Sequence, residues 1–519
     1  MMHCPHLSHP HHAAPHAPTP RRGDPRKHAG SLTASTALMA LLAGVVLMLF
    51  GCATPQAGSA PHALQESREL GANTSAATPW PDARWWGRYG DATLDRLIDQ
   101  ANAGQPALQT VQARIRVAEA NARAAQGARL PQAALSAGAT DQRFSENGLI
   151  PPPLGGTTRW SADLQAGASW ELDLFGRQRA ALDAALGQWR ASQAEAQAAR
   201  VLLAANVANS YFNLARLVEA RAVASDALAQ RQQIVALVRQ RIGAGLDTQV
   251  DLRQAEGLVA QSQVEIESLT EAMDRSRHAL AELVGTGPNA FDTLSPALAP
   301  LASVALPPSL PADLLGRRAD LVAQRWRVES ALRDSDVARA LFYPNVNLTA
   351  FIGLSSIGLD RLLESGSRTY GAGAALRLPL FEGGRLQANL DARRAEVDAA
   401  IDAYNGALQR ALREVADEMT GLRSIERQQL AQRDATVAAD AAYDLALQRY
   451  RAGLGNFLVV LTAQTNVLTQ RRAVTDLKAR HLASEVALVR ALGGGYAAEA
   501  TPGGGNAAAA DLPQITAAR

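Results

Sequence analysis

Side chains that could carry out chemistry are few in this chain of 519 residues. It has two Cys, two Lys and ten His. Of the ten His, only His62, His278 and His481 lie beyond residue 52. Neither Lys follows a phosphate-binding glycine loop, and no HExxH or GxSxG motif occurs. We interpret the scattered carboxylates as solvated groups or interhelical ion pairs, among them Glu195, Glu256, Glu265 and Glu418. The sequence therefore predicts no enzyme, no cofactor and no metal site.

One Cys has a context that points to covalent modification. An apolar run over residues 36–51 follows a basic pair and ends at Cys52. Its 16 residues are fewer than the roughly 20 of a spanning helix, so we interpret residues 1–51 as an N-terminal extension and signal peptide. Leu49-Phe50-Gly51-Cys52 resembles a bacterial lipobox, which implies diacylglycerol and an N-acyl chain on Cys52. An uncleaved anchor or ordinary cleavage near Ala53 is the alternative.

The charge balance excludes one class of partner. The chain has 51 basic and 49 acidic residues, a net charge of +2. Removal of residues 1–51 takes away four basic and one acidic residue, so the net charge becomes −1. A protein of this charge has no electrostatic basis for binding nucleic acid.

Proline usage indicates two sets of very long helices. No Pro occurs between Pro153 and Pro288, or between Pro379 and Pro502, and both stretches are rich in strong helix formers. Apolar residues recur there at intervals of seven, which predicts left-handed packing of helix on helix. The recurring positions are Leu252, Val259, Ile266, Met273 and Leu280 in the first stretch, and Val460, Val467, Val474 and Leu488 in the second, where His481 takes one position of the same heptad.

The mature chain reads as a tandem duplication. A shift of 208 positions places Ala244-Gly245-Leu246 on Ala452-Gly453-Leu454, together with the heptad positions. Each half predicts a helix, two strands, a long helix, a glycine-containing turn and a second long helix. We predict a linker over 52–84, a first repeat over 85–290, a linker over 291–309, a second repeat over 310–496, and a disordered tail over 497–519.

The strand predictions rest on alternation of apolar and polar residues. They cover about 133–144 and 160–174 in the first half, and about 345–354 and 370–380 in the second. In the second strand, Trp160, Leu164 and Trp170 share one face, and Asp163 and Glu171 share the other.

These strands indicate a membrane channel built from several copies. An exported chain can satisfy its backbone groups in an outer membrane only in a closed barrel, and four strands cannot close. Two copies would give a barrel filled by its own side chains, whereas three leave room for a lumen. We therefore expect a mostly α fold with a small β part: a homotrimer with a 12-stranded transmembrane β-barrel, continued by a long periplasmic α-helical barrel.

Six sequence blocks resemble the TolC-like outer-membrane efflux proteins, in particular the NodT branch of lipoproteins that serve resistance-nodulation-division pumps. They are WWGRYGDATLDRLIDQA (85–101), WELDLFGRQRAAL (170–182), LPADLLGRRADLVAQRWRVESA (310–331), ARALFYPNVNLTAFIGL (338–354), PLFEGGR (379–385) and ALGGGY (491–496). The resemblance implies a lipid-anchored exit duct in the outer membrane of a Gram-negative bacterium, extending into the periplasm. It also implies a periplasmic adaptor and an inner-membrane resistance-nodulation-division transporter as partners, with small toxic compounds conducted passively to the exterior.

The resemblance also implies site residues. The periplasmic hairpin tips would contact the adaptor or transporter, and they correspond to Gly243, Gly245, Leu246, Asp247, Gly453, Leu454 and Gly455. Members of this branch close the duct with a Leu and, four residues later, an Asp, which correspond to Leu458 and Thr462. Because Thr462 replaces the carboxylate, we expect an apolar plug without an acidic ring. Packing in a helix seam is the alternative role for both residues.

Two other functions remain open from the sequence. A duct for type I protein secretion would share this architecture, and the lipobox and the ALGGGY block favour the efflux branch over it. A non-conducting coiled-coil scaffold of the envelope would explain the heptads but not the alternating strands.

Overall fold

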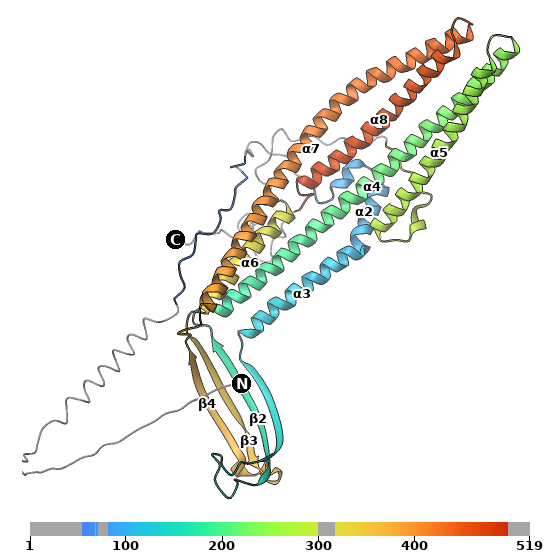
Figure 1. The fold of residues 1–519 in the computed structure, drawn as a ribbon. Helices are drawn as coiled ribbons and strands as arrows, with labels where there is room; N and C mark the ends of the chain where they lie inside the picture. Colours follow the sequence, from blue (N-terminus) through green and yellow to red (C-terminus); the bar gives the residue numbers. More distant parts are fainter. Residues whose placement is uncertain (1–53, 68, 71–80, 299–316, 497–519) are drawn as a thin grey trace, which may run out of the picture. The chain divides into compact units, whose positions relative to one another are not determined.

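The computed structural model describes residues 54–67, 69–70, 81–298 and 317–496, whose fold is shown in Figure 1. The predicted signal peptide, Cys52 and the predicted tail over 497–519 lie outside these described residues. The two predicted linkers and the start of the second repeat are described in part.

The described chain is mostly helical, and its two halves follow the same order of elements from the helix that directly precedes the strands of each half. The first half contains α2 (Ala92–Gly104), α3 (Pro106–Ala128), β1 (Gln132–Arg143), β2 (Thr158–Leu172), α4 (Arg177–Gly243) and α5 (Gln249–Val284). The second half contains α6 (Ala319–Ala340), β3 (Asn345–Ile357), β4 (Arg368–Arg377), α7 (Arg385–Arg451) and α8 (Phe457–Ala491). Short 3₁₀ helices lie at Trp85–Tyr89, Pro288–Phe291, Leu359–Arg361 and Ser365–Ser367.

The first half differs from the prediction by having two helices before its strands. Pro106 opens α3, where the missing N–H has no helical partner to lose. Gln105 caps both helices: its N–H donates to the Ala101 carbonyl (3.1 Å), and its side chain accepts from the Ala107 N–H (3.1 Å). The proline therefore divides what the pattern predicts as one helix.

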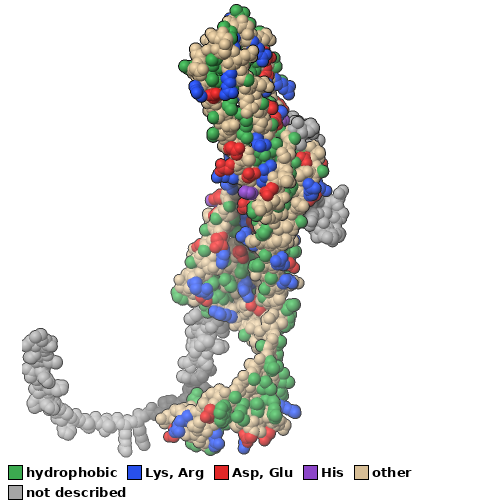
Figure 2. Space-filling view, turned by 90° about the vertical axis from the view of Figure 1, so that its right-hand side faces the viewer, with side chains coloured by type: hydrophobic (Ala, Val, Ile, Leu, Met, Phe, Trp, Pro, Cys, Tyr) green, Lys and Arg blue, Asp and Glu red, His purple; other side chains and the backbone are tan. Residues whose placement is uncertain are grey.

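The four strands form one antiparallel sheet in the order β1, β2, β3, β4. Its register brings the apolar positions of all four strands onto one face, and Figure 2 shows hydrophobic side chains gathered over the sheet. One row across that face consists of Leu135, Ala166, Ile352 and Tyr370. Within the described residues β1 pairs only with β2 and β4 only with β3, so both outer strands have an unpaired edge.

Two long hairpins of helices extend from the sheet (Figure 1). Helices α4 and α7 have 67 residues each, which corresponds to about 100 Å at 1.5 Å per residue. Each is paired with the helix that follows it, and α6 packs between α4 and α7. The predicted heptad positions are buried or half-buried in these seams, with Leu280 and Val460 fully covered.

The main hydrophobic core lies where α2, α4, α5 and α8 meet, around Trp85, Phe212 and Leu280. The ALGGGY block closes this region. Three consecutive glycines, Gly493, Gly494 and Gly495, have positive φ angles of 98°, 58° and 78°. A Cβ at Gly493 would lie 1.9 Å from the Arg317 carbonyl oxygen. Both the backbone conformation and the close approach therefore require glycine.

The first described residues, 54–66, run along α7. Three α7 side chains accept hydrogen bonds from their backbone N–H groups: Gln387 from Gln56 (3.0 Å), Asp398 from His62 (3.0 Å) and Asn405 from Gln65 (2.9 Å). These contacts hold the segment beside the half of α7 that is nearer the sheet.

Candidate functional site

The turns between paired long helices form the predicted hairpin tips. After α4, Gly245 adopts a left-handed conformation (φ 73°), and Thr248 caps α5 in a capping box with Asp251. After α7, Gly453 is also left-handed (φ 76°), and the Asn456 side chain accepts from the Val459 N–H (3.1 Å) to cap α8. Both turns reverse the chain with the same means, a positive-φ glycine followed by a polar cap.

A polar contact joins the two tips to each other. The Arg241 Nε donates to Asp247 Oδ2 (3.0 Å), and the Arg241 Nη1 donates to the Tyr450 carbonyl (2.8 Å). The Tyr450 hydroxyl donates to the same Asp247 carboxylate. The Arg241 guanidinium also lies over the Tyr450 ring, 4.4 Å from its centroid. One residue of the second hairpin is thus bound by two residues of the first.

This tip contact, defined as Arg241, Asp247 and Tyr450, is largely removed from solvent. The Arg241 and Asp247 side chains are 10% and 7% exposed, and Tyr450 is fully buried. Burial, followed by the hydrogen bond to Asp247, raises the pKa of Tyr450 above its ordinary value. The hydrogen bond to Asp247 raises the pKa of Arg241. Both groups therefore hold their protons, and the contact is a buried ion pair with a neutral phenol donor.

The other predicted tip residues lie at the surface. Leu246 and Leu454 are 60% and 70% exposed, and the tip glycines are exposed as well. Asp247 differs from them because its carboxylate faces Arg241 and Tyr450 rather than solvent. Its side chain is therefore occupied within the chain, whereas the two leucine side chains are exposed.

The predicted gate residues lie on one exposed face of α8. Leu458 is 62% exposed, and the exposed Thr462 lies one turn further along. The Thr462 hydroxyl donates to the Leu458 carbonyl (2.9 Å), and Thr465 and Thr469 make the same backbone bond to residues four positions earlier. Within the described chain the seam positions near this point are Phe457 and Val460, so neither predicted gate residue is packed in a seam.

Sequence reasoning missed Arg241 and Tyr450. The repeat gave a signal for Asp247 alone: the shift of 208 positions that relates the halves places Gly455 on Asp247, so the acid is present in only one turn, whereas Arg241 falls on Arg449.

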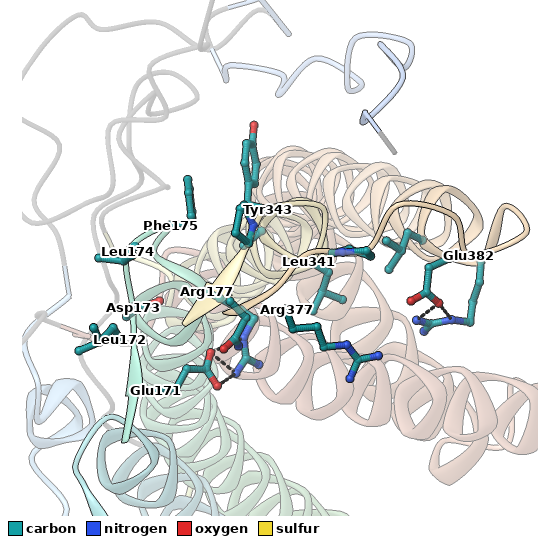
Figure 3. Close-up of a pocket in the computed structure, with 16 residues that line it drawn as sticks. Glu171, Leu172, Asp173, Leu174, Phe175, Arg177, Leu341, Tyr343, Arg377 and Glu382 are labelled. Atoms are coloured by element: carbon teal, nitrogen blue, oxygen red, sulfur yellow. Dashed lines mark hydrogen bonds and ion pairs between the residues drawn. The ribbon is translucent and has the colours of Figure 1, made fainter. Parts of the chain in front are cut away.

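A cavity of about 240 Å³ lies where the sheet joins the helices (Figure 3). Its carboxylates have partners: Arg177 forms a two-pronged ion pair with Glu171 (both oxygens 2.7 Å from Nη2), and Arg385 pairs with Glu382 (2.6 Å). Asp173 caps α4 by accepting from the Gln178 N–H (3.0 Å). These bonds therefore stabilise the junctions between strands and helices, and each of the three carboxylates that line the cavity is bound to a partner.

The carboxylates singled out on the helices are mostly paired. Glu256 forms an ion pair with Arg239 (2.8 Å), and Glu195 and Glu265 pair with Arg327 and Arg472 from other helices. Burial raises the pKa of the fourth, Glu418. No three His, Cys, Asp or Glu side chains among the described residues lie close enough to hold a metal ion. No described helix combines the length and apolar character needed to cross a membrane.

Comparison with known proteins agrees with this arrangement. The model of the outer membrane efflux protein family matches residues 97–286 and 310–494. The multidrug resistance outer membrane protein MdtP of Escherichia coli is 32% identical over 483 residues, which cover 89% of this chain and 97% of MdtP. The fusaric acid resistance protein FusA of Burkholderia cepacia is 37% identical over 374 residues, 70% of each chain.

A solved structure has the same fold. The outer membrane protein VceC of Vibrio cholerae superposes with a TM-score of 0.76 at 36% identity, covering 80% of this chain and 99% of VceC. The family match includes both halves of the chain and ends close to the triple-glycine turn. The chain therefore belongs to the outer membrane efflux protein family.

Proposed function

We propose that this chain is the outer-membrane exit duct of a tripartite efflux system, which conducts small toxic compounds passively to the exterior. One observation carries the proposal: the same chain contains helices of about 100 Å and a sheet that has an apolar face and two unpaired edges. A soluble scaffold made of coiled coils would not need a sheet of this kind. The family consists of outer-membrane efflux channels, which are not enzymes.

The open edges support a trimer. In hydrocarbon each unpaired backbone group costs several kcal/mol, so β4 of one copy must pair with β1 of the next until the sheet closes. Three copies supply twelve strands and leave a lumen. The apolar row of Leu135, Ile352 and Tyr370 would face lipid, and the opposite face with Asp163 would face the lumen. The long helices would continue the tube into the periplasm.

The tips would meet the other components of the system. Leu246 and Leu454 present apolar side chains at the ends farthest from the sheet, where an adaptor or a transporter could cover them. An adaptor (membrane fusion) protein and an inner-membrane resistance-nodulation-division transporter are the partners that we propose. The relatives' names, multidrug and fusaric acid resistance, support a small-molecule cargo over a secreted protein.

The gate would lie beside the tips. Leu458 extends into open space from α8, and in a trimer three such side chains would meet at one level and close the bore. Thr462 adds no charge there, because its side chain is a neutral hydroxyl, which donates to the Leu458 carbonyl. Closure would therefore be apolar and insensitive to divalent cations. The tip contact would hold the two hairpins of each chain together in this closed state.

A lipid on Cys52 would fix the N-terminal end of the mature chain to the membrane. Gln56 is bound to Gln387, only two residues after α7 begins, and the preceding strand β4 ends at Arg377. The described chain thus begins beside the end of α7 that is nearer the sheet.

Deletion of the gene, followed by a broad compound-susceptibility panel that includes fusaric acid, tests the function. We expect increased susceptibility to several small compounds, restored by the wild-type gene. Unchanged susceptibility to every compound would contradict efflux. Conductance of the purified protein in planar bilayers tests the duct directly, and a protein that forms no trimer and no pore would contradict the proposed architecture.

A further inference from the structure

The polar face of the sheet carries one large aromatic side chain at mid-height. Strand register places Phe351 of β3 between Gly167 of β2 and Gly371 of β4. The neighbouring positions on this face are small or polar, among them Gln165, Ser169, Thr349, Gly353 and Gly373. A phenylalanine here gains nothing from lipid, because the alternation of the strand points it to the opposite side.

The space over the two flanking glycines differs: the ring fills it at Gly371 and leaves it open at Gly167. A Cβ added at Gly371 would lie 2.8 Å from Phe351 Cε1 and 2.9 Å from Cζ, so the ring lies over Gly371. A Cβ added at Gly167 would meet nothing within 4 Å, so the space over that glycine is open. The Phe351 side chain keeps 38% of its surface exposed. The ring therefore lies against the sheet over Gly371, and the space over Gly167 on its other side, called the open slot below, is empty.

We propose that Phe351 is a contact site in the barrel lumen for planar aromatic solutes. In this proposal Gly371, which has no side chain, leaves room for the ring to lie against the wall, so that the bore stays open. This inference rests on the proposed trimeric duct, in which three copies of Phe351 would lie at one level. Aromatic rings attract one another in offset-stacked and edge-to-face arrangements, in addition to burying apolar area. The small neighbours of Phe351 give an aliphatic solute no equivalent stacking contact.

The glycines also predict how the ring responds to substitution. In Gly371→Ala the new methyl group occupies the position of the ring edge, so the ring must leave β4 and swing toward the open slot over Gly167. In the double variant Gly167→Ala/Gly371→Ala both slots are filled, and the ring must rise into the lumen. Gly167→Ala alone is the matched control, since its methyl group meets no atom.

A fluorine label at position 351 measures the position of the ring. We would incorporate 4-fluorophenylalanine at this position in the full-length trimer in lipid nanodiscs and record the ¹⁹F resonance with a water-soluble gadolinium chelate. Gly167→Ala should leave the resonance and its broadening unchanged. Gly371→Ala should shift the resonance, and the double variant should show the largest broadening. A Gly371→Ala resonance identical to that of wild type would overturn the role of the slot.

Titration with two carboxylate anions of equal charge tests the class of solute. 1-Naphthoate, a planar aromatic anion, should shift the wild-type resonance at a concentration at which cyclohexanecarboxylate leaves it unchanged. Equal shifts with both anions, or no shift with either, would overturn the contact site. Trimer formation and conductance of the unlabelled wild type are measured in parallel. Their loss would contradict the proposed duct, whereas a conducting trimer without these ¹⁹F responses contradicts only the role of Phe351.

Discussion

Removal of one hydroxyl from the tip contact should loosen the hairpin ends. In Tyr450→Phe the aromatic ring keeps its packing against Arg241 and Phe457, and only the hydrogen bond to Asp247 is lost. A buried hydrogen bond to a charged acceptor contributes roughly 1.5–3 kcal/mol. Local opening of the tips should therefore become about 10- to 150-fold more frequent.

Asp247→Ala should have a larger effect, because it leaves the Arg241 guanidinium with 10% exposure and no carboxylate. Breaking a buried ion pair by removing one partner costs about 3–5 kcal/mol. The order of effects, Asp247→Ala above Tyr450→Phe, follows from the unpaired charge that only the first change leaves behind.

Hydrogen exchange of the purified trimer, read by mass spectrometry on peptides that cover both turns, measures this opening directly. Tyr443→Phe is the matched control, since Tyr443 is a half-buried tyrosine on the same helix for which the structure shows no hydrogen bond to Asp247. We expect faster exchange at both turns in Tyr450→Phe and wild-type exchange in Tyr443→Phe. Unchanged protection in Tyr450→Phe, or equal loss in both variants, would refute the reasoning.

Three further outcomes follow from the site and the fold. Leu458→Ala should raise single-channel conductance in planar bilayers, because three apolar side chains would be cut back at the proposed plug, and wild-type conductance would reject that assignment. Cys52→Ser should abolish incorporation of radiolabelled palmitate, whereas undiminished labelling would show that another residue carries the lipid. Gly493→Ala should lower the melting temperature of the trimer, since left-handed strain and the 1.9 Å approach to the Arg317 carbonyl cost about 3 kcal/mol or more. Gly127→Ala, whose methyl group would meet nothing within 4 Å on α3, is its control and should melt no lower than wild type, since alanine favours a helix over glycine.

The sequence was sufficient for elements whose signal is local. Absence of Pro and a seven-residue period indicate long paired helices, since both are properties of a continuous segment. Alternation likewise indicates which side chains share a face of a strand. Pro106 divides the first predicted helix, and it could have been anticipated, because proline favours the first position of a helix.

Long-range contacts could not be predicted in this way. Tyr450 is 203 residues from Asp247 and 209 from Arg241, and no periodicity links positions so far apart. The slot of Phe351 depends on strand register, and a shift by one residue would place the ring on the lipid face. The tip contact arises only when the two halves are docked against each other, and Gly167 lies beside Phe351 only because β2 of the first half pairs with β3 of the second.

The two halves share one architecture but differ at particular residues. Each half supplies two strands and a helical hairpin, and the junction of β2 with β3 makes one sheet from both. Residues that maintain the scaffold occur twice, as the glycines at 245 and 453 do. Two residues of the tip contact occur once, since the shift of 208 positions places Gly455 on Asp247 and Tyr450 on Ile242, whereas Arg241 has a counterpart in Arg449. The hydrogen bond between the two hairpins therefore depends on positions at which the repeats have diverged, the Tyr450 hydroxyl on one hairpin and the Asp247 carboxylate on the other.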